Sequence, residues 1–185
     1  MPVNASNSDL DWQAPDFNLI SVNEKYYSLS QLSGKNGTLV AFICNHCPYV
    51  IRIIERFVYE SRELNNIGVS TIAIMSNDVK QYPEDSYEKM KEFSLKYDFK
   101  FHYLYDSTQQ VAKDYKAVCT PDIFGFNKNL QLKYRGRIDS KVVEENNNDI
   151  KREMYEAMKL IKETNEGPSN QLNSFGCSIK WANNE

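Results

Sequence analysis

The residues most able to do chemistry are two cysteines, Cys44 and Cys47, in the segment I-C-N-H-C-P-Y-V at residues 43–50. His46 lies between them, and Pro48 follows directly. Two thiols at this spacing can form and break a disulfide and so pass electrons, can supply half of a zinc site, or can be inert residues of a core. The elements that hold the pair decide between these alternatives.

The pair is expected at the junction of a strand and a helix. Residues 39–43 form a continuous apolar run and residues 69–75 form a second one, which is typical of strands buried on both faces. Between them, apolar side chains recur at helical spacing over residues 49–65. The N–H groups and partial positive charge at the start of such a helix lower the pKa of a nearby thiol from about 8.5 to roughly 3.5–7.5. A redox-active thiolate is therefore the favoured interpretation.

His46 and Pro48 bear on which thiol reacts. We expect His46 to tune the pair through a ring N–H hydrogen bond to a thiolate, the alternative being an exposed polar residue in a tight turn. A proline suits the first position of a helix, so Cys47 is expected at the N-cap. In the usual redox arrangement Cys44 attacks and Cys47 resolves. A capping Cys47 would receive the helix N–H groups and become a rival nucleophile.

A second landmark is V-C-T-P at residues 118–121, immediately before an expected β-hairpin. The bond between Thr120 and Pro121 is a candidate cis peptide, because X-Pro bonds in tight turns can be cis. Cys119 is either an auxiliary thiol that faces the first pair or a small buried residue at a strand start. Cys177 is either a further auxiliary thiol on a tail that could fold back or an ordinary tail cysteine.

Zinc is the structural alternative for the C-x-x-C pair. Cys119, Cys177, His102 or His46 could complete a site, but the sequence contains no second C-x-x-C and no H-x-x-x-H. We therefore expect no metal and no cofactor.

Length and composition limit the alternatives further. The chain has 185 residues, 41% of them apolar and 25% charged, with a formal net charge of -3, and nothing in these values indicates a nucleic-acid partner. No segment approaches the roughly 20 apolar residues of a membrane-spanning helix, and the N-terminus has no basic region followed by an apolar stretch. We expect a cytoplasmic protein without a membrane partner, whose four cysteines are redox-active or metal-binding.

The further elements follow from spacing, caps and turn residues. Helices are expected over residues 85–96 (capped by Asp85 or Ser86), 108–116 and 149–162, and strands over residues 122–126 and 130–135.

Parallel βαβ pieces followed by an antiparallel hairpin predict an α/β fold, a mixed central sheet with helices on both faces. We expect a single domain over residues 1–185. Its core covers about residues 14–165, and residues 166–185 form an irregular C-terminal tail.

Several motifs together resemble one known family. The chain is similar, over about residues 14–181, to the peroxiredoxin-like redoxins of the alkyl hydroperoxide reductase C/thiol-specific antioxidant (AhpC/TSA) type in the thioredoxin-like superfamily, and within these to a subfamily with the N-H-C-P-Y-V motif. The matching segments are A-P-D-F at 14–17, F-I-C-N-H-C-P-Y-V at 42–50, S-N-D at 76–78, Y-P-E-D-S at 82–86, Y-L-Y-D at 103–106, V-C-T-P at 118–121, Y-R-G-R-I-D at 134–139 and F-G-C-S-I-K-W at 175–181.

The resemblance implies a thioredoxin-like fold with an N-terminal extension, Pro121 as the cis-proline, and Cys44 and Cys47 as the redox pair. It also implies that the backbone at Thr120 holds a thiol substrate by strand-like pairing. The peroxiredoxin pattern P-x-x-x-T-x-x-C is not met. Aligned on Cys47, it finds Val40 and Cys44 where proline and threonine are needed. Aligned on Cys44, it finds alanine at residue 41 in place of threonine.

These observations favour a thiol-disulfide oxidoreductase in which Cys44 attacks a substrate disulfide and Cys47 resolves the mixed disulfide. The partners are a protein or low-molecular-weight disulfide or thiol, and an external thiol reductant. Arg135 and Arg137 either attract an anionic thiol to the cleft or are solvated at a strand end. The alternatives are a thiol-dependent peroxidase with an antioxidant role, in which Cys47 or Cys44 becomes a sulfenic acid, and a non-enzymatic redox-sensing or metal-binding module.

Overall fold

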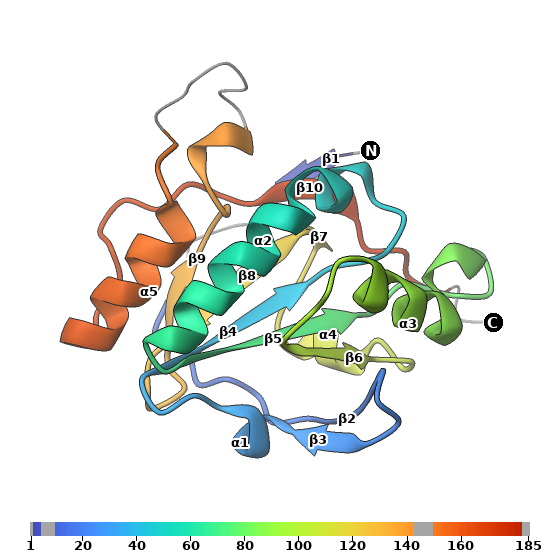
Figure 1. The fold of residues 1–185 in the computed structure, drawn as a ribbon, viewed down its shortest axis with the longest axis horizontal. Helices are drawn as coiled ribbons and strands as arrows, with labels where there is room; N and C mark the ends of the chain where they lie inside the picture. The colour runs from blue at the N-terminus through green and yellow to red at the C-terminus, as the bar shows by residue number, and fades with distance from the viewer. Residues whose placement is uncertain (1, 5–9, 143–149, 183–185) are drawn as a thin grey trace.

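A computed structural model describes residues 2–4, 10–142 and 150–182 of the chain. The centre of the molecule is a seven-stranded sheet of order β3-β2-β6-β5-β4-β8-β9 (Figure 1). Strands β4, β5 and β6 are parallel, and β8 runs antiparallel to β4. The bounds are β2 Asn18–Ser21, β3 Tyr26–Ser28, β4 Gly37–Phe42, β5 Val69–Met75, β6 His102–Tyr105, β8 Asp122–Phe126 and β9 Leu132–Arg135.

Helices cover both faces of this sheet, as predicted. Helices α2 (Pro48–Asn66), α3 (Tyr87–Lys96) and α5 (Glu153–Thr164) contribute to the hydrophobic cluster on one face, where Figure 1 shows α2 and α5 in front of the strands. The short helices α1 (Leu29–Leu32) and α4 (Gln110–Asp114) contribute to the cluster on the other face. All six residues of β4 are buried for this reason, which agrees with the continuous apolar run in the sequence. None of the helices described for residues 2–4, 10–142 and 150–182 is long and apolar enough to span a membrane.

Three predicted helices begin later than expected. Ser86 is the N-cap of α3, and a 3-10 turn, η1 (Pro83–Asp85), precedes it, so Asp85 is not the cap. Helix α4 starts only after Gln109, whose φ of 61° is left-handed. The predicted start of the last helix at residue 149 and the asparagine-rich loop before it lie outside the described residues, and α5 begins at Glu153.

The predicted irregular tail contains a strand. Strand β10 (Phe175–Ser178) is the middle of a second sheet of order β1-β10-β7, with β1 at Pro2–Asn4 and β7 at Cys119–Thr120. Both pairings are antiparallel. Figure 1 shows this small sheet beside the first turn of α2, and β10 contacts that helix. Residues from the two ends of the chain therefore meet where the C-x-x-C pair lies.

Candidate active site

Cys47 is the N-cap of α2, and Pro48 is the first residue of that helix, as predicted. The Cys47 side chain makes no capping hydrogen bond, while its carbonyl oxygen accepts from the N–H of Ile51 at 2.9 Å. Cys44 lies two residues beyond the end of β4, in the turn between strand and helix. Because the open N–H groups of a helix point at its N-cap, Cys47 occupies the more electropositive of the two positions.

Thr120 contacts both sulfur atoms of the pair. Cys47 Sγ lies 3.1 Å from the Thr120 carbonyl oxygen, and Cys44 Sγ lies 3.4 Å from the Thr120 hydroxyl. The peptide bond from Thr120 to Pro121 is cis, as predicted. The structure thus brings together the four residues Cys44, Cys47, Thr120 and Pro121, which are far apart in the sequence. All four cysteines of the chain are free thiols.

The two thiols of the pair differ in acidity. The Cys44 thiol, the Thr120 hydroxyl, and the thiol and backbone N–H of Cys177 all donate toward Cys47 and lower its pKa to about 4, against the opposing effect of burial. The Thr120 carbonyl oxygen, which accepts from a protonated Cys47 at 3.1 Å, favours the thiol form, as burial does. The pKa of Cys44 is raised well above its usual value by the hydrogen bond to Cys47, by burial and by the negative charge of Asp85. The opposite directions of the two pKa shifts favour a thiolate on Cys47 and a proton on Cys44.

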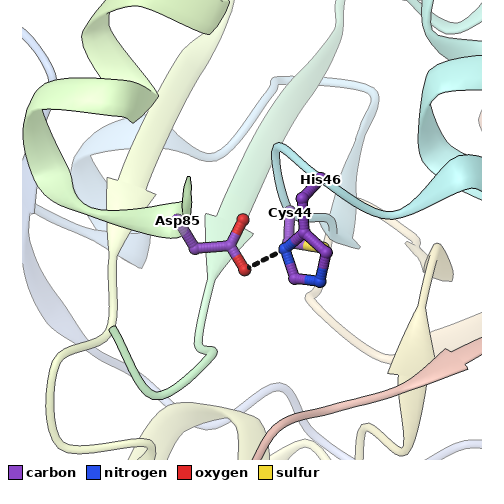
Figure 2. Close-up of side chains that lie close together, drawn as sticks. All are labelled: Cys44, His46 and Asp85. Carbon is purple, nitrogen blue, oxygen red and sulfur yellow. Dashed lines mark ion pairs between the residues drawn. The ribbon is translucent and has the colours of Figure 1, made fainter. Parts of the chain in front are cut away.

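His46 points to the carboxylate of Asp85, which was one of two residues expected to cap the next helix. Its Nδ1 atom lies 2.7 Å from Asp85 Oδ2, an ion-pair distance without the alignment of a hydrogen bond (Figure 2). Its ring stacks on Tyr82 at 5.5 Å between centroids. Among the described residues no hydrogen bond joins His46 to a thiolate. The side chain that His46 contacts is therefore Asp85 and not a thiolate.

Asp85 is fully buried and is held by donors from two neighbouring loops. The backbone N–H of Asn45 donates to Oδ1 at 2.8 Å, and the Asn77 side-chain amide donates to Oδ2 at 2.7 Å. Asn77 follows β5, which lies next to β4 in the sheet. The carboxyl ends of parallel strands lie at one edge of a sheet, so segments that follow β4 and β5 can meet there. The polar segments S-N-D and Y-P-E-D-S after β5 could therefore have indicated that Asp85 lies near Cys44.

Cys119 and the two arginines are held by burial or by ion pairs. Cys119 is fully buried, its Sγ is 3.5 Å from the Pro121 carbonyl oxygen, and burial raises its pKa, which favours the alternative of a small buried residue. The Arg135 guanidinium binds the Asp122 carboxylate, and the Arg137 guanidinium binds Glu153. Neither arginine is simply solvated. Ion pairs engage both guanidinium groups, which matches neither alternative considered from the sequence, attraction of an anionic thiol or solvation.

A three-ligand cluster is the best candidate for a metal in the described parts of the chain. Cys44 Sγ, His46 Nδ1 and an Asp85 oxygen lie within 4.8 Å of one another (Figure 2). Sulfur, imidazole and carboxylate are donors that zinc accepts. His46 is thus the one predicted additional zinc ligand in this cluster. Cys119, Cys177 and His102 are not part of it.

We expect the reduced protein to hold much less than one zinc ion per chain after dialysis against zinc. A metal-bound thiol must be ionised, and the pKa of Cys44 is raised, while both Asp85 oxygens already accept hydrogen bonds. Elemental analysis of the dialysed protein measures this, with Asp85→Asn as the matched variant. One zinc per chain in the wild type, lost in Asp85→Asn, would contradict the expectation and support a metal-binding module.

Cys177 lies beside the pair. Strand β10 places it opposite Thr120, and it is half-buried. Burial raises its pKa to about 11, and hydrogen bonding to Cys47 adds to the rise. The sequence indicated only that the tail could fold back, and the structure joins Cys44, Cys47 and Cys177 into one group of three thiols around Thr120.

Comparisons with known proteins give one family and closely similar structures. The model of the AhpC/TSA family matches residues 11–135. The crystal structure of an uncharacterized conserved protein from Geobacillus kaustophilus has 38% identity and a TM-score of 0.93, and covers 100% of this chain and 98% of that one. A hypothetical protein from Sinorhizobium meliloti has 31% identity and a TM-score of 0.90, over 98% of this chain and 99% of that one. The search of the curated proteins finds no match.

A more distant structure shows the fold alone. The thioredoxin domain of a thiol-disulfide oxidoreductase from Bacteroides vulgatus has 14% identity and a TM-score of 0.59, over 69% of this chain and 87% of that one. The thioredoxin-like fold predicted from the sequence is thus confirmed.

Proposed function

The chain belongs to the AhpC/TSA family of thioredoxin-like redoxins, and from that premise we propose that it is a thiol-disulfide oxidoreductase whose redox pair is Cys44 and Cys47. The observation that carries the proposal is the shared contact of both sulfurs with Thr120, at the start of α2 and next to cis-Pro121. The expected location is the cytoplasm, where external thiol reductants are present.

The acidity of the two thiols supports Cys47 as the attacking group. Its thiolate attacks one sulfur of a substrate disulfide, the substrate S–S bond breaks, and the first substrate sulfur leaves as a thiolate. Cys44 then attacks the Cys47 sulfur, the mixed disulfide breaks, and the Cys44 proton passes to a departing sulfur. The result is a Cys44–Cys47 disulfide and two substrate thiols, and an external thiol reductant restores the pair. This assignment reverses the roles expected from the sequence, where Cys44 attacks.

Asp85 supports this order of events. Its negative charge lies close enough to Cys44 to raise the pKa of that thiol. Cys44 therefore keeps its proton while Cys47 is the free thiolate. Once Cys47 is in a mixed disulfide, the hydrogen bond from Cys44 to the Cys47 thiolate no longer exists, and Cys44 is easier to ionise. His46, whose ring faces Asp85, is a positioning residue for that carboxylate.

A thiol-dependent peroxidase is the second candidate function, and the lowered pKa of Cys47 favours it. A thiolate at a helix N-terminus is also the group that peroxide oxidises to a sulfenic acid. Against it stands Cys44, which occupies the position where the peroxiredoxin pattern requires a threonine hydroxyl.

The two candidates differ in the oxidant that the reduced protein prefers. We expect a small-molecule disulfide to oxidise the Cys44–Cys47 pair faster than an equal concentration of hydrogen peroxide does. Stopped-flow tryptophan fluorescence, with disulfide formation checked by thiol alkylation, measures both rates. A faster reaction with peroxide, together with a sulfenic acid trapped at Cys47, would reject the oxidoreductase in favour of the peroxidase. Oxidation without turnover by any thiol would indicate a redox sensor.

A further inference from the structure

Strand β10 occupies the edge of β7 beside the redox pair. Its register places Cys177 opposite Thr120 and Ser178 opposite Cys119, and the N–H of Ile179 donates to the Val118 carbonyl at 3.1 Å. The family resemblance implied that a substrate strand pairs with the backbone at Thr120, on this same edge. The chain's own β10 therefore takes the place of a substrate strand, and an outside strand could pair there only after β10 had left.

The fit of β10 against β7 is tight. A Cβ atom added to Gly176 would come within 2.0 Å of the Thr120 carbonyl oxygen, so only glycine permits the observed approach. At the start of β10, the Phe175 ring packs edge-on against Tyr49 at 5.6 Å, and just after its end Ile179 is only 3% exposed. β10 is thus a fixed part of the site.

The position of Cys177 in β10 is that of a substrate cysteine. It lies opposite Thr120, whose carbonyl oxygen is 3.1 Å from Cys47 Sγ, and it packs against the hydrophobic cluster that contains Cys44 and Cys47. The side chains of Cys44 and Cys47 belong to residues that are 1% and 0% exposed, whereas Cys177 is only half-buried. Of the three grouped thiols, Cys177 is the one that a solvent-borne thiol reaches most readily.

We propose that Cys177 exchanges disulfides with the buried pair and carries the oxidising equivalent to the protein surface. This inference rests on the proposed function, because it needs the Cys44–Cys47 disulfide as its starting point. The Cys177 thiolate attacks the Cys47 sulfur, a Cys47–Cys177 bond forms, and the Cys44–Cys47 bond breaks. The proton of Cys177 ends on Cys44. One disulfide is exchanged for another, so the step needs no oxidant or reductant.

The external thiol reductant of the proposed function then acts on the new disulfide. Its thiolate attacks the Cys177 sulfur, and Cys47 departs as a thiolate that its hydrogen-bond donors stabilise. A second reductant thiol attacks the reductant's own sulfur in the remaining mixed disulfide and releases Cys177. The protein has gained two electrons, the reductant leaves as its disulfide, and all three cysteines are reduced again.

Two measurements on the full chain test this relay. The reduced protein is oxidised with one equivalent of diamide, free thiols are blocked in acid, and the disulfides are mapped by peptide mass spectrometry. We expect both Cys44–Cys47 and Cys47–Cys177 linkages in the wild type, and Cys47–Cys177 alone in Cys44→Ser. Cys177→Ser should still form the Cys44–Cys47 disulfide, but its reduction by glutathione should be slower by about tenfold or more, because access limits thiol exchange.

Cys119→Ser is the matched control. It removes a cysteine from the strand next to β10, yet Cys119 has no part in the proposed exchange, so its reduction rate should equal that of the wild type. A Cys44–Cys47 disulfide with Cys177 always free, and with wild-type reduction of Cys177→Ser, would overturn the relay and leave the proposed function intact. A Cys47–Cys177 link found only between two chains would also overturn it. The absence of any Cys44–Cys47 disulfide would refute the proposed function itself.

Discussion

Replacement of Cys47 by serine should reduce turnover of a disulfide substrate to the uncatalysed rate. A serine hydroxyl is not ionised near neutral pH and cannot form a disulfide, so both the attacking group and the mixed-disulfide intermediate are lost. Cys44→Ser should also stop turnover, but it should leave the first attack, because the thiolate is on Cys47. Reduction of a chromogenic disulfide by each variant, with and without glutathione, measures these effects. Cys119→Ser should be unaffected.

The pH dependence of the first attack follows from the same assignment. Because the pKa of Cys47 is lowered to about 4, its thiolate is already formed at pH 6, and the single-turnover rate should change little from pH 6 to pH 8. A thiol of ordinary acidity, with a pKa of about 8.5, would instead react roughly tenfold faster for each pH unit in this range. Pre-steady-state rates in the wild-type protein separate the two, and the steep rise would contradict a Cys47 thiolate.

Arg135→Met should lower the free energy of unfolding by about 3–5 kcal/mol, because it leaves a buried carboxylate without its partner. Asp122 is fully buried, and the Arg135 guanidinium donates to its Oδ2 at 2.8 Å and to Oδ1 at 3.3 Å. The same carboxylate accepts from the N–H of Val118, just before β7. The pair therefore anchors β8 and the strand that carries Thr120. Urea denaturation, followed by circular dichroism, measures the loss.

A double variant and a change of pH distinguish the loss of the ion pair from a general loss of packing. The double variant Arg135→Met/Asp122→Leu should recover most of the lost stability, because an apolar pair in a buried place is often no worse than an ion pair. In Arg135→Met alone, the loss should be smaller at pH 5 than at pH 8. Burial already raises the pKa of Asp122 above its usual value, so the folded protein binds the extra proton, and its stability falls as pH rises. A loss below 1 kcal/mol at pH 8 would contradict the structural role.

The sequence predicted the parts of the site that depend on local patterns. Two apolar runs and a helical spacing located β4, β5 and α2, and with them the C-x-x-C pair at the start of a helix. Pro48 placed Cys47 at the N-cap, since a proline has no N–H to lose at the first helical position. The Thr120–Pro121 bond was expected to be cis from its place before a hairpin.

What the sequence did not predict depends on contacts between distant segments. Asp85 was expected only as one of two possible helix caps. Tertiary packing instead directs its carboxylate to Asn45 and Asn77. Strand β10 has only four residues and pairs with β7, more than fifty positions earlier, so no period in the sequence marks it. The low pKa of Cys47 results in part from Cys177 on that strand, and it could not be assigned before the strand was seen.

The central claim is that Cys47 attacks and Cys44 resolves, and trapping a mixed disulfide tests it most directly. The reduced variants Cys44→Ser and Cys47→Ser, each with Cys119 and Cys177 also replaced by serine, are mixed with oxidised glutathione, and the adducts are mapped by mass spectrometry. The account predicts a stable glutathione adduct on Cys47 in the Cys44→Ser protein, and little or none on Cys44 in the Cys47→Ser protein. A stable adduct on Cys44, with Cys47 unreactive, would contradict it.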